Sequence, residues 1–168
     1  MAGDKDGKLA KMVVETYADA TYSKKTGHYA VLFNPENYSA DWDFTFETKE
    51  FVNGGNLPGR LQSISHSNFD MTFIIDGTGV GAAALGRDKI NVMDEVWNFL
   101  EATTVLSRKS SRKQKPPYCM LVWGSLCARC FVKRVKLEMR LLDRNGTPLR
   151  AALITSFQTF YPSSAKTK

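Results

Sequence analysis

The residues best suited to chemistry in this chain are two cysteines, Cys127 and Cys130, which form a Cys-x-x-Cys pair. This spacing is typical of a redox dithiol or of half a zinc site. A zinc site needs two further ligands, and only Cys119, His28 and His66 remain, none of them in a paired spacing. A thioredoxin-like dithiol stands at a helix N-terminus, whereas these cysteines stand among strand patterns.

The direction of the two side chains gives a second argument. If Cys127 and Cys130 lie in one continuous strand, their spacing places the side chains on opposite faces of the sheet. A bend at Gly124 and Ser125 would instead place one of them in a turn. We predict that the cysteines serve as small hydrophobic residues, with no thiol chemistry and no metal.

No other motif predicts catalysis or a cofactor. The run Gly-Thr-Gly-Val-Gly-Ala at 77–82 approaches the dinucleotide fingerprint, but Ala82 stands at its last glycine and no Gly-Lys-Ser/Thr ending follows. His66 lies between two serines without the elbow motif of a hydrolase, and Asp41 and Asp43 lie on the polar side of a strand pattern. We predict no enzyme activity and no cofactor.

The charge of the chain is divided unevenly between its halves. Residues 1–84 contain 7 Lys and Arg against 11 Asp and Glu, whereas residues 85–168 contain 16 against 6. A basic half is typical of a nucleic-acid partner, but an acidic half beside it also suits copies of one protein that meet acidic face to basic face. A merely solvated, uneven surface is the third interpretation. The densest positive run lacks aromatic residues for stacking on bases and contains Arg108, Lys109, Arg112, Lys113 and Lys115.

The length of 168 residues indicates a single domain, 1–168, with loose tails at 1–10 and 162–168. No run of roughly 18 apolar residues predicts a membrane span, and the first residues lack the apolar stretch of a signal peptide. We therefore expect synthesis in the cytoplasm and no direct membrane insertion.

Most of the chain has strand patterns. A β-branched and aromatic run at 28–33 ends at the turn Asn-Pro-Glu-Asn, and residues 38–46 then alternate apolar and polar side chains. Residues 69–76 alternate again. From Tyr118 the strand patterns continue almost to the end of the chain, through a hairpin turn at 143–148.

Two segments interrupt the strands. Residues 47–60 contain the run Asn-Gly-Gly-Asn-Leu-Pro-Gly and predict a long flexible connection. Residues 88–106 predict the one helix, capped by Asp88 or Asn91. We expect its apolar stripe to pack on a sheet, and the stripe consists of Ile90, Met93, Val96, Trp97 and Leu100.

Taken in order, the motifs form a set. An early Phe-Asn-Pro-x-x-Tyr precedes an aromatic-alternating strand, an apolar strand from Asp70 to Asp76, and the helix. A Pro-Pro then precedes a Trp-Gly strand, and a hairpin with Asn-Gly-x-Pro-x-Arg-Ala leads into an aromatic-ended strand. Over residues 10–161 the set resembles the tube-protein family of contractile injection systems, the phage-tail-like machines. It looks most like the baseplate component that adapts the inner tube to the spike hub. The motif residues are Phe33, Asn34, Pro35, Tyr38, Trp123, Gly124, Asn145, Gly146, Pro148, Arg150 and Ala151.

This resemblance implies a mainly β fold of the α+β class, in which two antiparallel sheets form a small barrel or sandwich flanked by one helix. It implies a non-enzymatic structural protein that forms a six-copy ring at the baseplate. The ring would join the spike hub protein to the inner-tube protein, contact other baseplate proteins and start tube assembly. The alternative within the family is the repeating inner-tube subunit itself. The particle would be cytoplasmic, membrane-tethered or released.

Loops are natural candidates for contacts between subunits, because they carry interactions that the sheets position. We predict subunit-interface residues at Asn53 and Leu57 and at the five cations of the loop 107–117. The unlike charges of the two halves suit the head-to-tail contacts of a ring. Outside the family, the alternatives are a basic β-barrel that binds nucleic acid and a small-ligand or redox barrel. We expect no nucleic-acid partner.

Overall fold

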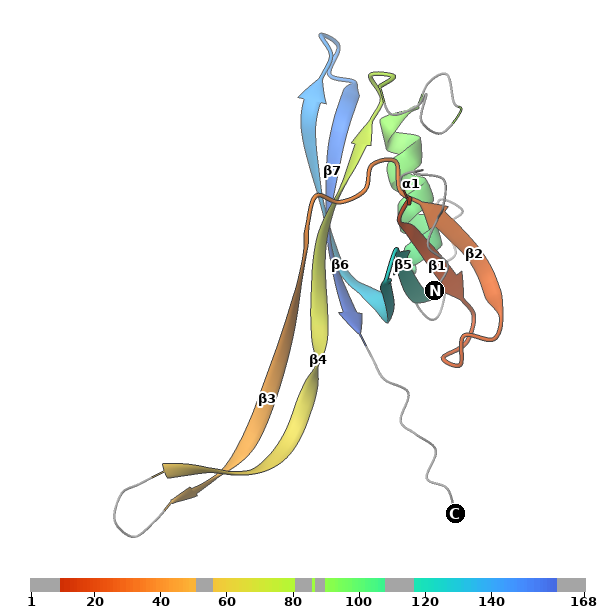
Figure 1. Cartoon of the computed structure of the whole chain (residues 1–168). Helices are drawn as coiled ribbons and strands as arrows, with labels where there is room; N and C mark the ends of the chain where they lie inside the picture. Colours follow the sequence, from red (N-terminus) through yellow and green to blue (C-terminus); the bar gives the residue numbers. More distant parts are fainter. Residues whose placement is uncertain (1–9, 51–55, 81–85, 87–89, 108–116, 160–168) are drawn as a thin grey trace.

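The computed structural model describes residues 10–50, 56–80, 86, 90–107 and 117–159. In these ranges the chain forms seven strands and one helix (Figure 1). The strands are β1 (Val13–Tyr17), β2 (Lys25–Ala30), β3 (Tyr38–Glu50), β4 (Asn56–Asp76), β5 (Tyr118–Trp123), β6 (Leu126–Leu142) and β7 (Pro148–Thr159), and the helix is α1 (Val92–Thr103).

The seven strands belong to one antiparallel sheet with the order β2-β1-β5-β6-β7-β4-β3. The mainly β class with one flanking helix is confirmed, but the expected pair of sheets is a single sheet. The reason is the length of β6, which pairs with β5 over Leu126–Cys130 and with β7 from Cys130 onward. Within the described residues the outermost strands β2 and β3 do not pair with each other, so the sheet is not closed into a barrel.

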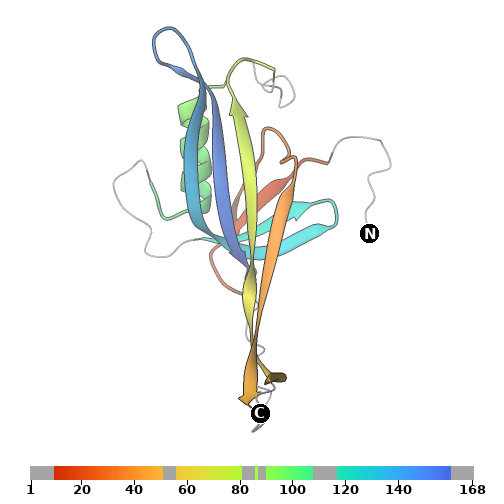
Figure 2. The same ribbon diagram turned by 90° about the vertical axis from the view of Figure 1, so that its left-hand side faces the viewer.

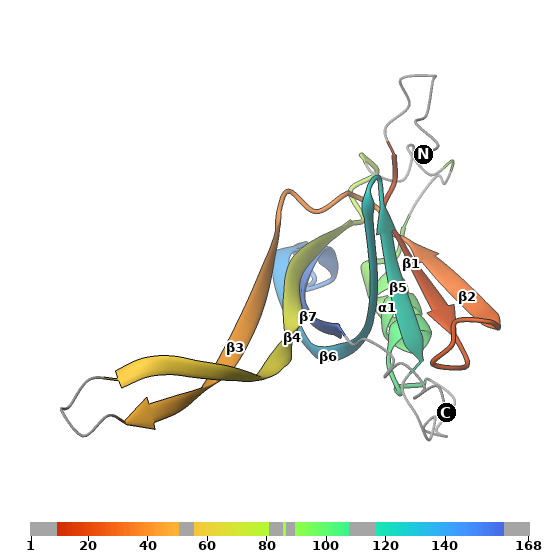
Figure 3. The ribbon, with the colours of Figure 1, turned by 60° about the horizontal axis from the view of Figure 1, so that its bottom comes forward.

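The change of partner along β6 divides the sheet into two wings (Figures 1 and 3). The small wing consists of β2, β1, β5 and the first residues of β6, and the large wing consists of the rest of β6 with β7, β4 and β3. The core lies between the wings and α1, which packs against strands of both. Phe99 of α1 is fully buried there and contacts the rings of Tyr29 and Phe73 at centroid distances of 5.3 and 5.5 Å.

The helix packs on the sheet as predicted, but it faces the core with other residues. Asn91 caps it, since its side-chain oxygen accepts a hydrogen bond from the Asp94 N–H at 3.2 Å. The helix begins at Val92, and its buried face contains Phe99, which the predicted stripe omits. Of that stripe, Val96 lies on the buried face, Ile90 is buried just before the helix, and Met93, Trp97 and Leu100 are half-buried.

The first strand, β1, has no counterpart among the predicted strands. The motif residue Asn34 fixes the chain just before it. The Asn34 Oδ1 accepts a hydrogen bond from the Met12 N–H at 2.9 Å, and its Nδ2 donates to the Ala10 carbonyl at 2.8 Å. The neighbouring Pro35 is buried and Phe33 packs against the core. The Phe-Asn-Pro motif therefore connects the segment before β1 to the core between the two wings.

The two glycines among the motif residues, Gly124 and Gly146, lie in turns. Gly124 has a φ of +58° in the two-residue turn between β5 and β6, and Gly146 has a φ of +80° in the turn before Pro148. A positive φ favours glycine, so these positions suit their turns. Asn145 does not share the positive φ; its N–H donates to Asp143 Oδ1 at 2.8 Å.

Strands β3 and β4 form a long two-stranded ribbon that extends away from the rest of the molecule (Figures 1 and 2). The predicted flexible connection at 47–60 is therefore wrong at both ends, because β3 continues to Glu50 and β4 begins at Asn56. Backbone hydrogen bonds hold this pairing, and they need no apolar pattern. The three register shifts along the ribbon each leave the extra residue on β4. Such bulges bend a ribbon, and β3 keeps its strict alternation.

Candidate assembly surface

The ribbon carries an exposed row of aromatic side chains on β3. Trp42, Phe44 and Phe46, which we call the aromatic strip, have exposed fractions of 55%, 55% and 48%. They lie on the same side of β3 as Ala40, which is in register with the buried Phe69 of β4. The aromatic strip therefore continues the core face of the sheet into a region where no other part of the described chain covers it.

The strand that carries the aromatic strip is also an open edge. Among the described residues, β3 pairs with β4 on one side only. A long, exposed and apolar edge strand is a template for pairing with another chain. Contiguous exposed apolar surface likewise marks sites of protein contact. The two properties together identify β3 as a candidate assembly surface.

The opposite edge of the large wing is open as well. Beyond Cys130, the side of β6 that faced β5 has no partner strand in the part of the chain that the structure describes. Leu137 and Met139 lie on β6 opposite the buried Leu153 and Ala151 of β7, and each is 39% exposed. We call Leu137 and Met139 the β6 patch. It lies on the same face of the sheet as the aromatic strip, at the other edge.

The two open edges carry charges of opposite sign. Acidic residues alternate with the aromatic strip on β3, and basic residues lie along β6. Glu138 lies between two of these basic residues. It accepts a hydrogen bond from Lys136 at 2.8 Å and forms an ion pair with Arg140 at 3.5 Å. The exposed acidic residues of β3 are Asp41, Asp43 and Glu47, and the exposed basic residues of β6 are Lys133, Arg134, Lys136 and Arg140.

Two motif residues far apart in the sequence meet at one end of the large wing. Arg150 of β7 donates to Asp76 Oδ2 of β4 through Nε at 2.7 Å and contacts it through Nη2 at 2.5 Å. The Asp76 side chain is almost fully buried and also accepts hydrogen bonds from the Thr78 N–H and hydroxyl. The pair lines a cavity of about 770 Å³ together with Asn34 and Arg140. The ion pair joins β4 to β7 where β4 ends and β7 begins.

This ion pair predicts a pH dependence of stability. Burial alone would raise the pKa of Asp76, but the hydrogen bonds from Thr78 and Arg150 outweigh it and hold the pKa below the ordinary 3.8. A lowered folded-state pKa contributes stability that is present above the ordinary value and lost as the pH falls through the folded value. We expect urea unfolding of the wild type to show this loss below about pH 4, and Asp76→Asn to lower the free energy of unfolding by about 1–2 kcal/mol at pH 7.

The control for this prediction is Asp70→Asn, which removes the same charge from the exposed other end of the apolar strand. We expect it to change the free energy of unfolding by less than about 0.5 kcal/mol. An Asp76→Asn variant that loses as much stability on acidification as the wild type would contradict the assignment to Asp76.

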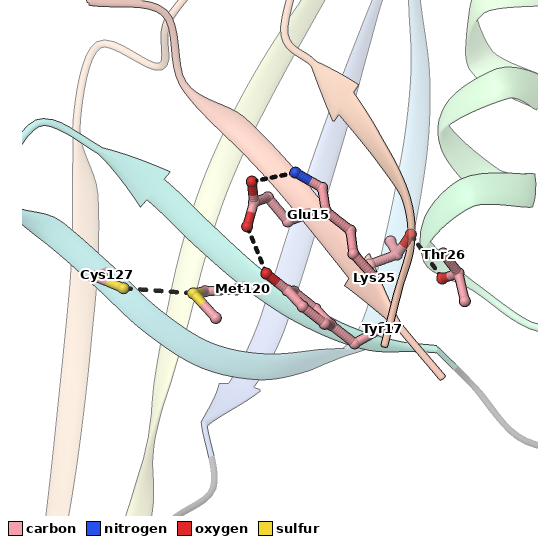
Figure 4. Close-up of polar contacts among 7 residues, drawn as sticks. Glu15, Tyr17, Lys25, Thr26, Met120 and Cys127 are labelled. Atoms are coloured by element: carbon pink, nitrogen blue, oxygen red, sulfur yellow. Dashed lines mark hydrogen bonds and ion pairs between the residues drawn. The ribbon is translucent and has the colours of Figure 1, made fainter. Parts of the chain in front are cut away.

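The cysteines of the Cys-x-x-Cys pair lie on opposite faces of β6, as predicted for a continuous strand. Cys130 is buried in the core. Cys127 is exposed, with its Sγ 3.5 Å from Met120 Sδ (Figure 4). On the same outer face, Glu15 accepts a hydrogen bond from the Tyr17 hydroxyl at 2.7 Å and pairs with Lys25. Over the described residues, no group of three or more His, Cys, Asp and Glu is arranged to hold a metal.

The predicted interface residues are not brought together by the described part of the chain. Asn53 and the five cations Arg108, Lys109, Arg112, Lys113 and Lys115 lie outside the described residues. Leu57 belongs to β4, opposite Lys49 of β3. These assignments stay predictions. The β6 patch was missed, although the alternation of residues 135–141 is a signal that could have indicated it.

Within the described residues, the large wing has two open edges and an uncovered apolar strip, which is typical of a subunit that is completed by other chains. Comparison with protein-family models matches residues 8–168 to the contractile injection system tube protein family. The match spans essentially the whole sequence, so the chain belongs to this family and is a structural tube component of a contractile injection particle. No curated protein matches it at a significant level. Within the described ranges, no helix has both the length and the apolar character needed to cross a membrane.

Proposed function

We propose that this chain forms a six-copy ring at the baseplate of the injection particle, where it joins the spike hub to the inner tube and starts tube assembly. The main support for a ring is that the large wing has two open edges, β3 at one side and β6 at the other. A closed ring needs two different surfaces on each subunit, one for each neighbour. These edges are such surfaces.

The direction of the strands suits a ring. The large wing has the order β6-β7-β4-β3, and each pair in it is antiparallel. In a sheet with an even number of antiparallel strands, the two edge strands run in opposite directions. Copies related by rotation can therefore pair β3 of one subunit with β6 of the next in the antiparallel manner. The sheet would continue from subunit to subunit without a reversed copy.

The side chains at the two edges complement each other. Pairing of β3 with β6 would place the aromatic strip and the β6 patch on one face of the continued sheet, because both lie on that face. It also brings the acidic residues of β3 to the basic residues of β6. Opposite charges favour encounter in one orientation and disfavour the pairing of like edges, which would place the same charges together.

The copy number sets the size of the central opening. Six large wings would contribute roughly 24 strands, and barrels of about 16–18 strands already enclose an aqueous channel. A six-copy ring is thus wide enough to form a tube with an open lumen. Six copies is what the resemblance to the baseplate adaptor implies, and the geometry of the edges is compatible with it.

The place of the ring in the stack is supported by the motif order, which resembles that of the adaptor between hub and tube. The family description favours a second candidate, the repeating inner-tube subunit. The two differ in what stops growth. An adaptor has unlike partners on its two faces and stops after one ring, whereas a repeating subunit stacks on copies of itself.

The test is native mass spectrometry and negative-stain microscopy of the purified chain, alone and mixed with the inner-tube and spike hub proteins of the same particle. We expect a six-fold mass or rings, binding to both partners, and tube growth from the hub only when this chain is present. Long tubes formed by the chain alone would establish the repeating subunit instead. A chain that stays monomeric in every mixture would overturn the ring.

A further inference from the structure

Two cysteines on neighbouring strands face each other in the core, and one of them, Cys130, belongs to the Cys-x-x-Cys pair. Cys119 of β5 and Cys130 of β6 are directly opposite in the antiparallel ladder, and both are fully buried. Their side chains therefore point to the same face of the sheet. Neither cysteine is in a disulfide in the structure.

The position of the two cysteines is compatible with a disulfide. Directly opposite residues of an antiparallel pair have Cα atoms about 4.5–5.5 Å apart, and a disulfide needs about 4.4–6.8 Å. Cys127 does not have this relation to either cysteine, because it pairs with Val122 and is exposed on the other face. The geometry selects Cys119 and Cys130 from the three cysteines of the chain.

We propose that Cys119 and Cys130 are a latent cross-strand disulfide, which forms when the chain meets a disulfide oxidant and then fastens the junction of the two wings. The location gives the bond its effect. Cys119–Cys130 is the last rung between β5 and β6, and Cys130 is also the first residue of β6 that pairs with β7. A bond there links the strands at the point where the sheet divides.

The reaction is a thiol–disulfide exchange with a small disulfide such as oxidised glutathione. The thiolate of one cysteine attacks the oxidant, which forms a mixed disulfide and releases one glutathione thiol. The thiolate of the second cysteine then attacks the sulfur of the first cysteine in the mixed disulfide, forms the Cys119–Cys130 bond and releases a second glutathione thiol. The protein loses two electrons and two protons, and the two glutathione thiols gain them.

The closed structure protects the pair. Burial raises the pKa of the Cys130 thiol, and the neighbouring Cys119 raises it further. A protonated and buried thiol reacts slowly, so exchange requires local opening of the strand end. Cys119 is the second residue of β5, and its carbonyl accepts a hydrogen bond from the Tyr22 hydroxyl at 3.2 Å. Opening of this end breaks few rungs of the ladder, and strand ends open more readily than strand centres.

The experiment is refolding of the full chain in a buffer of reduced and oxidised glutathione, which allows the thiols to equilibrate before the core closes. After acid quenching and denaturation, alkylation and peptide mass mapping count the free thiols and locate the bond. We expect one free thiol, Cys127, and a Cys119–Cys130 linkage. We expect a melting temperature higher by about 5–10 °C, which a reductant reverses.

The variants separate this pair from other linkages. Cys127→Ser is expected to retain the bond and the thermal shift, whereas Cys119→Ser and Cys130→Ser are each expected to lose both. A chain that refolds in the oxidising buffer with all three thiols free would overturn the proposal, as would a bond that maps to Cys127. The readout requires no ring or tube, so its result is independent of the proposed assembly.

Discussion

A chain with Trp42→Ser, Phe44→Ser and Phe46→Ser is expected to remain monomeric under conditions in which the wild type forms rings. The aromatic strip is half-exposed in the single chain, so its burial has to come from a neighbour. Large aromatic residues at the centre of an interface contribute about 2 kcal/mol or more each, and their effects are not fully additive. Together we expect about 4–6 kcal/mol per interface, which weakens each contact on the order of 10³–10⁴-fold.

The measurement is native mass spectrometry beside urea unfolding of the same samples. The triple variant should keep the wild-type free energy of unfolding within about 1 kcal/mol, because the substituted side chains are already exposed in the monomer. A control is Val80→Ser, which removes an exposed apolar side chain that belongs to neither β3 nor β6. It should form rings like the wild type. Rings of undiminished stability in the triple variant would exclude the aromatic strip from the interface.

The alternation on β3 shows what the sequence alone can predict and what it cannot. The pattern at 38–46 correctly indicated a strand with one apolar face. It did not indicate whether the protein itself covers that face, because periodicity reports which side chains point together and not what lies above them. In the structure, Ala40 is half-buried beside the core while Trp42 is exposed, although both belong to one pattern.

The sequence also does not predict which strands pair with each other when they are far apart in the chain. The interpretation of Cys127 and Cys130 needed only the period of one strand, and it was correct for their opposite faces. The alignment of Cys119 with Cys130 depends on a turn of two residues at Gly124 and Ser125. Once this turn is known, the register follows by counting. The sequence does not distinguish a bend at this glycine from a two-residue turn, because both have the same local composition.

A Phe99→Ala variant is expected to lose about 3–5 kcal/mol of unfolding free energy, the largest loss that we expect from one side chain. Phe99 is fully buried where α1 meets strands of both wings, and its ring contacts Tyr29 of β2 and Phe73 of β4. Its removal leaves a cavity that these rings cannot fill without moving the wings. A domain of this size has about 5–15 kcal/mol of stability, so the melting temperature should fall by roughly 10 °C.

The matched control is Trp97→Ala, which truncates a larger aromatic side chain two residues earlier on the same helix. Trp97 belongs to the predicted apolar stripe but is only half-buried, so we expect a loss of about 1–2 kcal/mol. Both variants place alanine in a helix interior, so differences in helix propensity are small beside the packing effect. Phe99→Leu should recover most of the stability, since it restores much of the lost volume. Urea unfolding followed by circular dichroism measures all three variants. A greater loss for Trp97→Ala than for Phe99→Ala would show that α1 faces the core as the sequence stripe predicted and not as the structure places it.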